Sequence, residues 1–193
     1  MIEVLLLEHV AFCLLFALRL LGWIRPRAAA NASVNLDARR ETRAGWLLTA
    51  HGAAFGVFYA AFALAVSEGG GRLAWSTVPT LGALVNVLGI GLLAWTFRVF
   101  HSWRLLARLE PGHVLCTSGP FRWIRHPIYL ACDLLAVGTA IAVGAVALWL
   151  GAVLVILGGD LRARAEERVL AAAFGPVYRL YLARSKRWIP GLY

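Results

Sequence analysis

The chain has 193 residues, of which 61% are hydrophobic and only 15% are charged, and its formal net charge is +9. Soluble domains are about 45–50% apolar and about 25% charged, so this composition excludes a soluble globular protein and indicates a membrane protein. A disordered chain is excluded as well, because disordered segments are poor in aromatic residues and this chain has eight Trp and nine Phe.

Three apolar stretches are each long enough to cross a bilayer, which takes about 20 residues. They run from about Ile2 to Ile24, from about Trp46 to Val66 and from about Val78 to Phe100. We expect one membrane-embedded domain over residues 1–193, in which residues 1–77 hold the first two helices and residues 78–193 hold the rest.

Individual polar and small residues in these stretches have ordinary explanations. Glu8 and His9 lie about two turns into the first stretch, where solvation at the membrane interface accounts for them. His51 lies one turn into the second stretch, where snorkelling accounts for it. Gly52 and Gly56 have the GxxxG spacing that permits close helix approach, either within the monomer, which we favour, or in a dimer.

The fourth apolar run, from Ile128 to Leu157, is too long for one untilted crossing and too short for two full ones. Its middle contains Gly138 and Gly144, which weaken a helix, so we expect a hairpin of two short helices. The second helix should continue past Asp160 as a charged amphipathic helix that ends at Phe174–Pro176. The predicted fold is an all-α integral membrane protein with about five transmembrane helices, the last two a short hairpin.

The basic residues fall into three clusters between nearly bare apolar stretches. Of the nineteen Lys and Arg residues, five lie between Arg25 and Arg43, five between Arg98 and Arg125, and seven between Arg162 and Arg187. The positive-inside rule places such clusters in the cytoplasm and the N-terminus outside. The basic excess therefore indicates topology, and nucleic-acid binding is the weaker interpretation.

The densest polar signal is the segment HVLCTSGPFRWIRHPIY, His113–Tyr129, which leads the chain back into the bilayer. Gly119 and Pro120 break a helix and leave backbone N–H and C=O groups for a ligand, while Arg125 and His126 supply charge and hydrogen bonds. The alternative is a re-entry loop whose arginines meet lipid headgroups.

A second charged group lies in DLRARAEERVL, Asp160–Leu170, beyond the membrane exit. Arg162 and Glu166 share one helix face, whereas Glu167 points elsewhere. These residues form either an exposed ion-pair ladder or, with the preceding segment, a mixed-charge pocket. In such a pocket a guanidinium would hold a carboxylate and a glutamate would hold an ammonium group.

Asp133 is a further candidate, because it follows Tyr129 by one turn and a lone carboxylate in the bilayer is costly unless it is paired or wet. The three cysteines have no CxxC spacing and no histidine pairing, so neither a metal site nor a disulfide is predicted.

Two motifs, in this order, resemble those of a known family. The first is GPFRWIRHPIYL, and about forty residues later follow Arg162, Glu166, Glu167, Leu170, Phe174, Gly175, Tyr178 and Tyr181. Together they resemble the isoprenylcysteine carboxyl methyltransferase family, which is related to membrane phospholipid methyltransferases. The similarity covers roughly Leu88 to Pro190.

The resemblance implies a membrane enzyme that takes S-adenosylmethionine in a cytoplasm-facing C-terminal region and methylates a lipophilic or prenylated acceptor that arrives through the membrane lipid. It implies that Arg162 faces the acceptor, and we add Arg125 as a second catalytic candidate. To the residues that match the family's cofactor site we add Gly119, which breaks the helix, and Glu167, which adjoins the matching residue Glu166. The cofactor-binding candidates are then His113, Val114, Leu115, Cys116, Gly119, Phe121, His126, Pro127, Ile128, Tyr129, Glu166 and Glu167.

The acceptor favoured by the resemblance is a carboxylate of the isoprenylcysteine type, which is ionised without a base and could be positioned by Arg162. A phenolic acceptor has a pKa near 10 and would need deprotonation, for which His126, Asp133 and Glu167 are candidates. Phospholipid amines and thiols are further alternatives. An NADPH-dependent reductase is the alternative reaction, because sterol-reductase-like proteins resemble the same C-terminal region.

Overall fold

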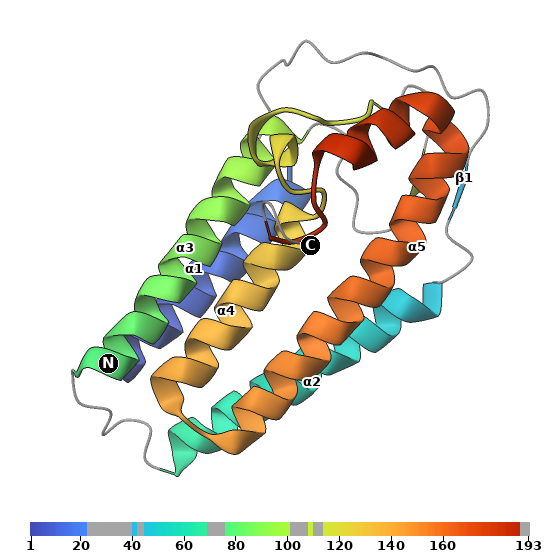
Figure 1. Ribbon diagram of the computed structural model, residues 1–193. Coiled ribbons are helices and arrows are strands. Elements are labelled where there is room, and N and C mark those ends of the chain that lie inside the picture. Colours follow the sequence, from blue (N-terminus) through green and yellow to red (C-terminus); the bar gives the residue numbers. More distant parts are fainter. Residues whose placement is uncertain (23–39, 42–44, 69–75, 101–107, 110–113, 190–193) are drawn as a thin grey trace.

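The computed structural model describes residues 1–22, 40–41, 45–68, 76–100, 108–109 and 114–189, and this part of the chain is almost entirely helical (Figure 1). Its long helices are α1 (Ile2–Leu20), α2 (Gly45–Ser67), α3 (Thr77–Val99), α4 (Pro127–Val143) and α5 (Val146–Arg184). A short 3₁₀ helix, η2, spans Gly119–Arg122, and two-residue strands β1 (Arg40–Glu41) and β2 (Arg108–Leu109) pair antiparallel. The predicted all-α class is confirmed for these residues.

Three of the helices, α2, α3 and α5, are long and apolar enough to cross a membrane, and α4 is a shorter apolar helix. Helix α1 has 19 residues and includes Glu3, Glu8 and Arg19. The protein is therefore an integral membrane protein. Helix α5 has 39 residues and bends at Gly175; the part before the bend, residues 146–174, has 29 residues, which at 1.5 Å per residue gives about 43 Å, longer than the roughly 30 Å hydrocarbon core. Its charged second half must extend beyond the membrane.

The predicted hairpin is present, but only one of the two glycines makes the turn. Gly144 ends α4 in the left-handed conformation, with φ 77°, and α5 starts two residues later. Gly138 lies inside α4, where a Cβ atom would come within 2.6 Å of the carbonyl oxygen of Gly82 on α3. Gly138 is thus a helix-contact residue and does not break the helix.

Helices α3 and α4 pack side by side, and α2 packs along α5 (Figure 1). In the α2–α5 pair, Phe58 of α2 packs against Gly151 of α5. Seven residues away on each helix, His51 packs against Gly158. A Cβ atom at either glycine would lie 2.9 Å from its partner. This close approach buries His51, so the snorkelling prediction for His51 is wrong.

Glu8 and His9 are also buried, and they belong to a polar network that joins α1, α3 and α4. The Asn86 side chain donates to Glu8 Oε2 at 2.8 Å, and the Thr139 hydroxyl lies 3.3 Å from His9 Nε2. Interface solvation therefore does not explain these two residues. Buried polar groups need partners, and here three helices supply them.

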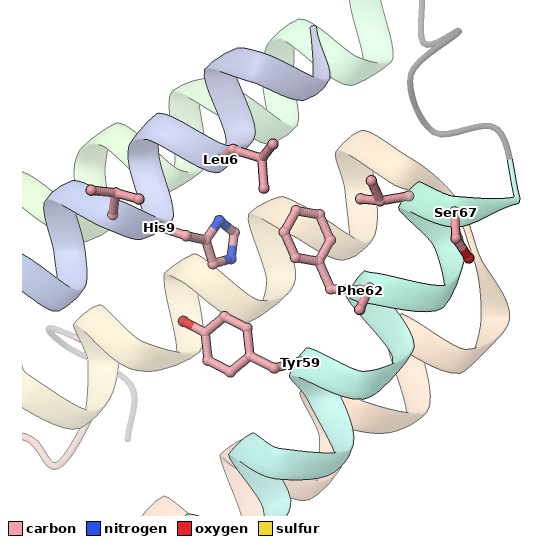
Figure 2. A pocket seen from close by; sticks show the side chains of 8 residues that line it. Leu6, His9, Tyr59, Phe62 and Ser67 are labelled. Carbon is pink, nitrogen blue, oxygen red and sulfur yellow. The ribbon is translucent and has the colours of Figure 1, made fainter.

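A cavity of about 440 Å³ opens beside this network, between α1 and α2 (Figure 2). The His9 ring stacks on Phe62 with 4.8 Å between ring centroids, and Tyr59 meets it edge-on. The lining is almost wholly apolar: Leu6, His9, Val10, Tyr59, Phe62, Ala63, Val66 and Ser67. This cavity lies toward the start of α1, away from the sequence motifs.

Candidate functional site

A kink in α5 brings the last described residues back to the loop that precedes α4. Gly175 has φ 52° and ψ −124°, which favour glycine, and Pro176 follows it. The sequence predicts that the helix ends at this point, but helical turns continue to Arg184. The helix therefore changes direction here and does not end. Beyond them, Lys186 pairs with Ile124 in a parallel bridge, and the backbone N–H of Arg125 donates to the Lys186 carbonyl at 2.7 Å.

Glu167 is the centre of the charged cluster that this fold-back completes. Its carboxylate accepts hydrogen bonds from Arg125 Nε at 2.8 Å and from Arg187 Nη2 at 2.7 Å, and His126 Nε2 lies 3.3 Å away. Burial alone would raise the pKa of Glu167, but these three partners outweigh it and hold the pKa well below its usual range. Glu167 is a permanently charged group whose oxygens are already engaged.

Glu166 is held more loosely. It accepts a hydrogen bond from the Tyr129 hydroxyl, and its contacts with Arg162 Nη2 and His126 Nδ1 are both 3.7 Å, too long for hydrogen bonds. Its side chain is 22% exposed, against 12% for Glu167. Of the two adjacent glutamates, Glu166 has the capacity to bind a ligand.

Aromatic rings cover this cluster on the α4 side. His126 stacks on Tyr129 with an interplanar angle of 12°, and the Trp188 ring lies 6.1 Å from each of them. The Arg162 guanidinium lies 5.2 Å from the centre of the Tyr129 ring, a cation–π distance. The site thus combines alternating charges with an aromatic wall in which Trp188 is tilted against the stacked pair.

The loop before α4 forms a separate wall against the end of α3 and the tail of α5. Leu115 packs with Phe174, Tyr178 and Tyr181. The Tyr181 hydroxyl donates to the carbonyl oxygen of Phe121 at 2.7 Å. The Tyr178 hydroxyl is buried and has no hydrogen-bond partner among the described residues, which leaves it available to a ligand.

Two further loop residues are tied to α3. The Cys116 thiol donates to the carbonyl oxygen of Val99 at 3.6 Å, and burial raises its pKa. Gly119 has φ 57°, and a Cβ atom there would lie 3.0 Å from the Val99 side chain and 3.3 Å from the Trp95 indole nitrogen. The loop must therefore have glycine at this position.

The structure brings together six of the predicted site residues: Arg125, His126, Tyr129, Arg162, Glu166 and Glu167. Glu167 joins the cluster although its position on the helix differs from that of Arg162 and Glu166, because its partners come from the loop and the tail. The remaining described candidates, Val114, Leu115, Cys116, Gly119, Phe121, Pro127 and Ile128, line the neighbouring loop and the start of α4. His113 lies outside the described residues.

Asp133 is buried one turn further along α4, and its Oδ1 has no hydrogen-bond partner in the described part of the chain. Its carboxylate is within electrostatic reach of the Asp160 carboxylate on α5.

Three members of the site escaped sequence reasoning: Asp160, Arg187 and Trp188. Arg187 bridges Glu167 and Asp160, with Nη1 3.2 Å from Asp160 Oδ1. In the sequence, Arg187 is one of several basic residues of the third cluster, and Trp188 belongs to neither motif. The available signal was the Gly175–Pro176 pair, which can reverse a helix and so return the residues after it to the site.

Apolar helices with a mixed-charge and aromatic cluster between the start of α4 and the middle of α5 define an integral membrane protein with a candidate binding site at one end of the bundle. The model of the isoprenylcysteine carboxyl methyltransferase family matches residues 81–172, which include most of α3, the loop before α4, all of α4 and Arg162, Glu166 and Glu167. The match covers 92 of the 193 residues and supports assignment of the chain to this family of methyltransferases. No curated protein matches the chain in a direct comparison.

Proposed function

We propose that the protein transfers a methyl group from S-adenosylmethionine to a lipophilic acceptor at the cluster around Glu166. The observation that carries this proposal is the difference between the adjacent carboxylates: Glu167 is fully engaged, whereas Glu166 is partly exposed and loosely paired beside an aromatic wall. The family membership supports the reaction class.

The residues present fit the methyl donor. Its ammonium group suits Glu166, its carboxylate suits an arginine of the cluster, and its flat adenine suits the rings of His126, Tyr129 and Trp188. The unpartnered Tyr178 hydroxyl offers one more hydrogen bond. When bound, the donor supplies a methyl group on a sulfonium sulfur, which is already activated for in-line displacement.

The protein's own residues mainly orient the reactants and exclude water. Arg125 and Arg187 fix Glu167, which in turn fixes the His126 ring. Tyr129 fixes Glu166, and Arg162 lies over the Tyr129 ring, where it could orient the oxygen of the acceptor. The acceptor class expected from the resemblance, an isoprenylcysteine carboxylate, would use Arg162 in this way.

Cofactor binding is tested by titrating S-adenosylhomocysteine into the detergent-solubilised protein in a calorimeter. We expect binding by the wild type and a loss of about 1.5–3 kcal/mol for Glu166→Gln, the usual value of a hydrogen bond to a charged group. Glu68→Gln, at an exposed site at the far end of α2, is the matched control. Binding of NADPH without binding of S-adenosylhomocysteine would refute the proposal and favour the reductase alternative.

Turnover is tested by incubation with labelled S-adenosylmethionine and membrane lipid extract. Because Arg162 is assigned to the acceptor, Arg162→Ala should lower label transfer while leaving S-adenosylhomocysteine affinity close to that of the wild type. Loss of cofactor affinity with unchanged turnover at saturating cofactor would reverse this assignment.

A further inference from the structure

His51 of α2 is a buried histidine with an unused ring nitrogen. Its side chain is 3% exposed, and Nε2 has no hydrogen-bond partner among the residues that the structure describes. Buried polar atoms in native proteins are nearly always hydrogen-bonded, so each exception calls for an explanation such as a ligand or a catalytic role.

The hydrogen bond of the other ring nitrogen, Nδ1, determines whether Nε2 carries a proton in the neutral ring. His51 has a hydrogen bond to the backbone of Val155 on α5. Since Nε2 is the atom without a partner, this bond belongs to Nδ1, and a backbone carbonyl can only accept. In the neutral ring Nδ1 therefore carries the proton, and Nε2 presents a lone pair, the form required of a base.

His51 lies directly behind the methyl-transfer site. Its ring meets the Tyr129 ring edge-on with 5.8 Å between centroids. A Cβ atom built on Gly159 would lie 3.6 Å from the Trp188 ring, 3.7 Å from the Tyr129 Cβ and 3.8 Å from the His51 ring, so the three side chains surround this glycine. The Arg162 guanidinium, on the Tyr129 ring, is within electrostatic reach of His51.

Two of the three bases considered from the sequence, His126 and Glu167, are engaged, and the third, Asp133, is buried on α4. Glu167 accepts from Arg125 and Arg187, and both ring nitrogens of His126 face a glutamate. A carboxylate acceptor would also have to compete with Glu166 for Arg162. A neutral acceptor avoids this competition but needs a base.

Building on the function proposed above, we propose that His51 is the general base of the reaction and that the acceptor enters the site as a neutral hydroxyl compound, such as a phenol or an enol. The O–H bond of the acceptor breaks, and its proton passes to Nε2 of His51. The oxygen forms the bond to the methyl carbon while the bond from that carbon to sulfur breaks, and the sulfur leaves as a neutral thioether. The imidazolium then releases its proton to water.

Proton transfer can be observed without turnover by using a nitrophenol with a long alkyl chain and S-adenosylhomocysteine in place of the methyl donor. The absorbance of the nitrophenolate reports ionisation of the bound phenol. We expect the wild-type complex to raise the ionised fraction above that in detergent alone, and we expect His51→Phe to abolish this rise. Phe preserves the ring that packs against Gly158 and Phe55 but removes both nitrogens.

Turnover provides the second readout. With the true methyl donor, His51→Phe should lower methylation of an alkylphenol by about 10²–10⁴-fold, the usual contribution of a general base. Methylation of a fatty acid of equal chain length, which is already ionised, should not fall if the wild type accepts it. Gly52→Ala is the matched control, because Gly52 adjoins His51 but is exposed and its added Cβ would meet nothing.

The outcomes separate the base from other roles. Unchanged nitrophenol ionisation in His51→Phe, with cofactor affinity intact, would overturn the inference, as would failure of the wild type to ionise the phenol. Asp133→Asn should behave as the wild type, and a loss confined to that variant would move the role to Asp133. If His51→Phe fails to fold, as judged by cofactor affinity, His51→Gln replaces it. Absence of S-adenosylhomocysteine binding by the wild type would instead refute the proposed function.

Discussion

At the scale of single residues, Glu166 and Glu167 are adjacent in the chain but differ in role. Helix geometry places them about 100° apart, which predicts that only one shares a face with Arg162. The structure agrees for Glu166, yet Glu167 reaches the same site because Arg125 and Arg187 approach it from the loop and the tail. Two adjacent residues of one helix can therefore have different functions: we propose that Glu166 binds a ligand, whereas Glu167 holds the surrounding side chains in place.

Removing the Glu167 charge should destabilise the protein in a pH-dependent way. Glu167→Gln leaves the half-buried Arg125 and Arg187 underpaired, so we expect a loss of about 2–4 kcal/mol. Because the folded pKa is below the unfolded value of 4.5, this stabilisation is fully present above that pH and is lost as pH falls toward the folded pKa. Melting curves of both proteins from pH 8 to pH 3 test this.

Glu68→Gln, on an exposed residue, controls for the general effect of removing one negative charge. A difference between wild type and Glu167→Gln that already shrinks between pH 8 and pH 6 would contradict the assigned pKa direction.

At the scale of elements, close helix packing depends on glycines one heptad apart. Gly82 and Gly89 of α3 meet the backbone of α4 near Gly138 and Ala131, so both contacts recur after seven residues. The GxxxG pair of α2, Gly52 and Gly56, meets nothing within 4 Å, so its predicted packing within the monomer is wrong. Small residues permit two helices to approach closely, but the spacing of glycines in the sequence does not indicate which of them lie at a helix contact.

Substitution of a contact glycine should therefore be costly. In Gly82→Ala the new Cβ would lie 2.5 Å from the backbone nitrogen of Ala142, so α3 and α4 must separate. We expect a loss of about 1–3 kcal/mol, typical of overpacking. Gly91→Ala, in the same helix but with open space around it, should be neutral or slightly stabilising. Equal melting temperatures of the two variants in detergent would contradict this account.

Sequence patterns predicted the helices well, because the length of an apolar stretch and its turn residues determine local structure. The observed α2 and α3 differ from the expected spans by only about one residue at each end. The motif residues on α4 and α5 were also found, because their spacing is local. Arg187, Trp188 and His51 were not found, because each reaches the site through long-range packing. Arg187 depends on the backbone conformation of Gly175, and His51 depends on the approach of α2 to Gly158.

At the scale of the whole molecule, the charged site lies at one end of the bundle and the polar network of Glu8 and His9 belongs to the helix segments nearer the other end. The basic clusters predict that the site faces the cytoplasm and that the α2–α3 connection faces outside. The proposed function requires this orientation, because the proposed methyl donor, S-adenosylmethionine, is cytoplasmic.

Cysteine labelling in intact cells tests the orientation. In a background without native cysteines, Glu68→Cys should react with a membrane-impermeant maleimide, whereas Arg168→Cys should react only after permeabilisation. Both positions are exposed, and Arg168 lies on the charged half of α5. The reverse labelling pattern would place the site outside and would contradict the predicted topology.

The parallel bridge between Ile124 and Lys186 has a consequence for biogenesis. During synthesis, α4 and the apolar first half of α5 can enter the membrane while Glu167 still lacks Arg187 and Tyr129 still lacks Trp188. The cluster can close only after the tail has left the ribosome and turned back at Gly175. A chain inserted without these tail residues in place therefore carries a half-built site, and under the proposed function it cannot be competent before the tail has folded back.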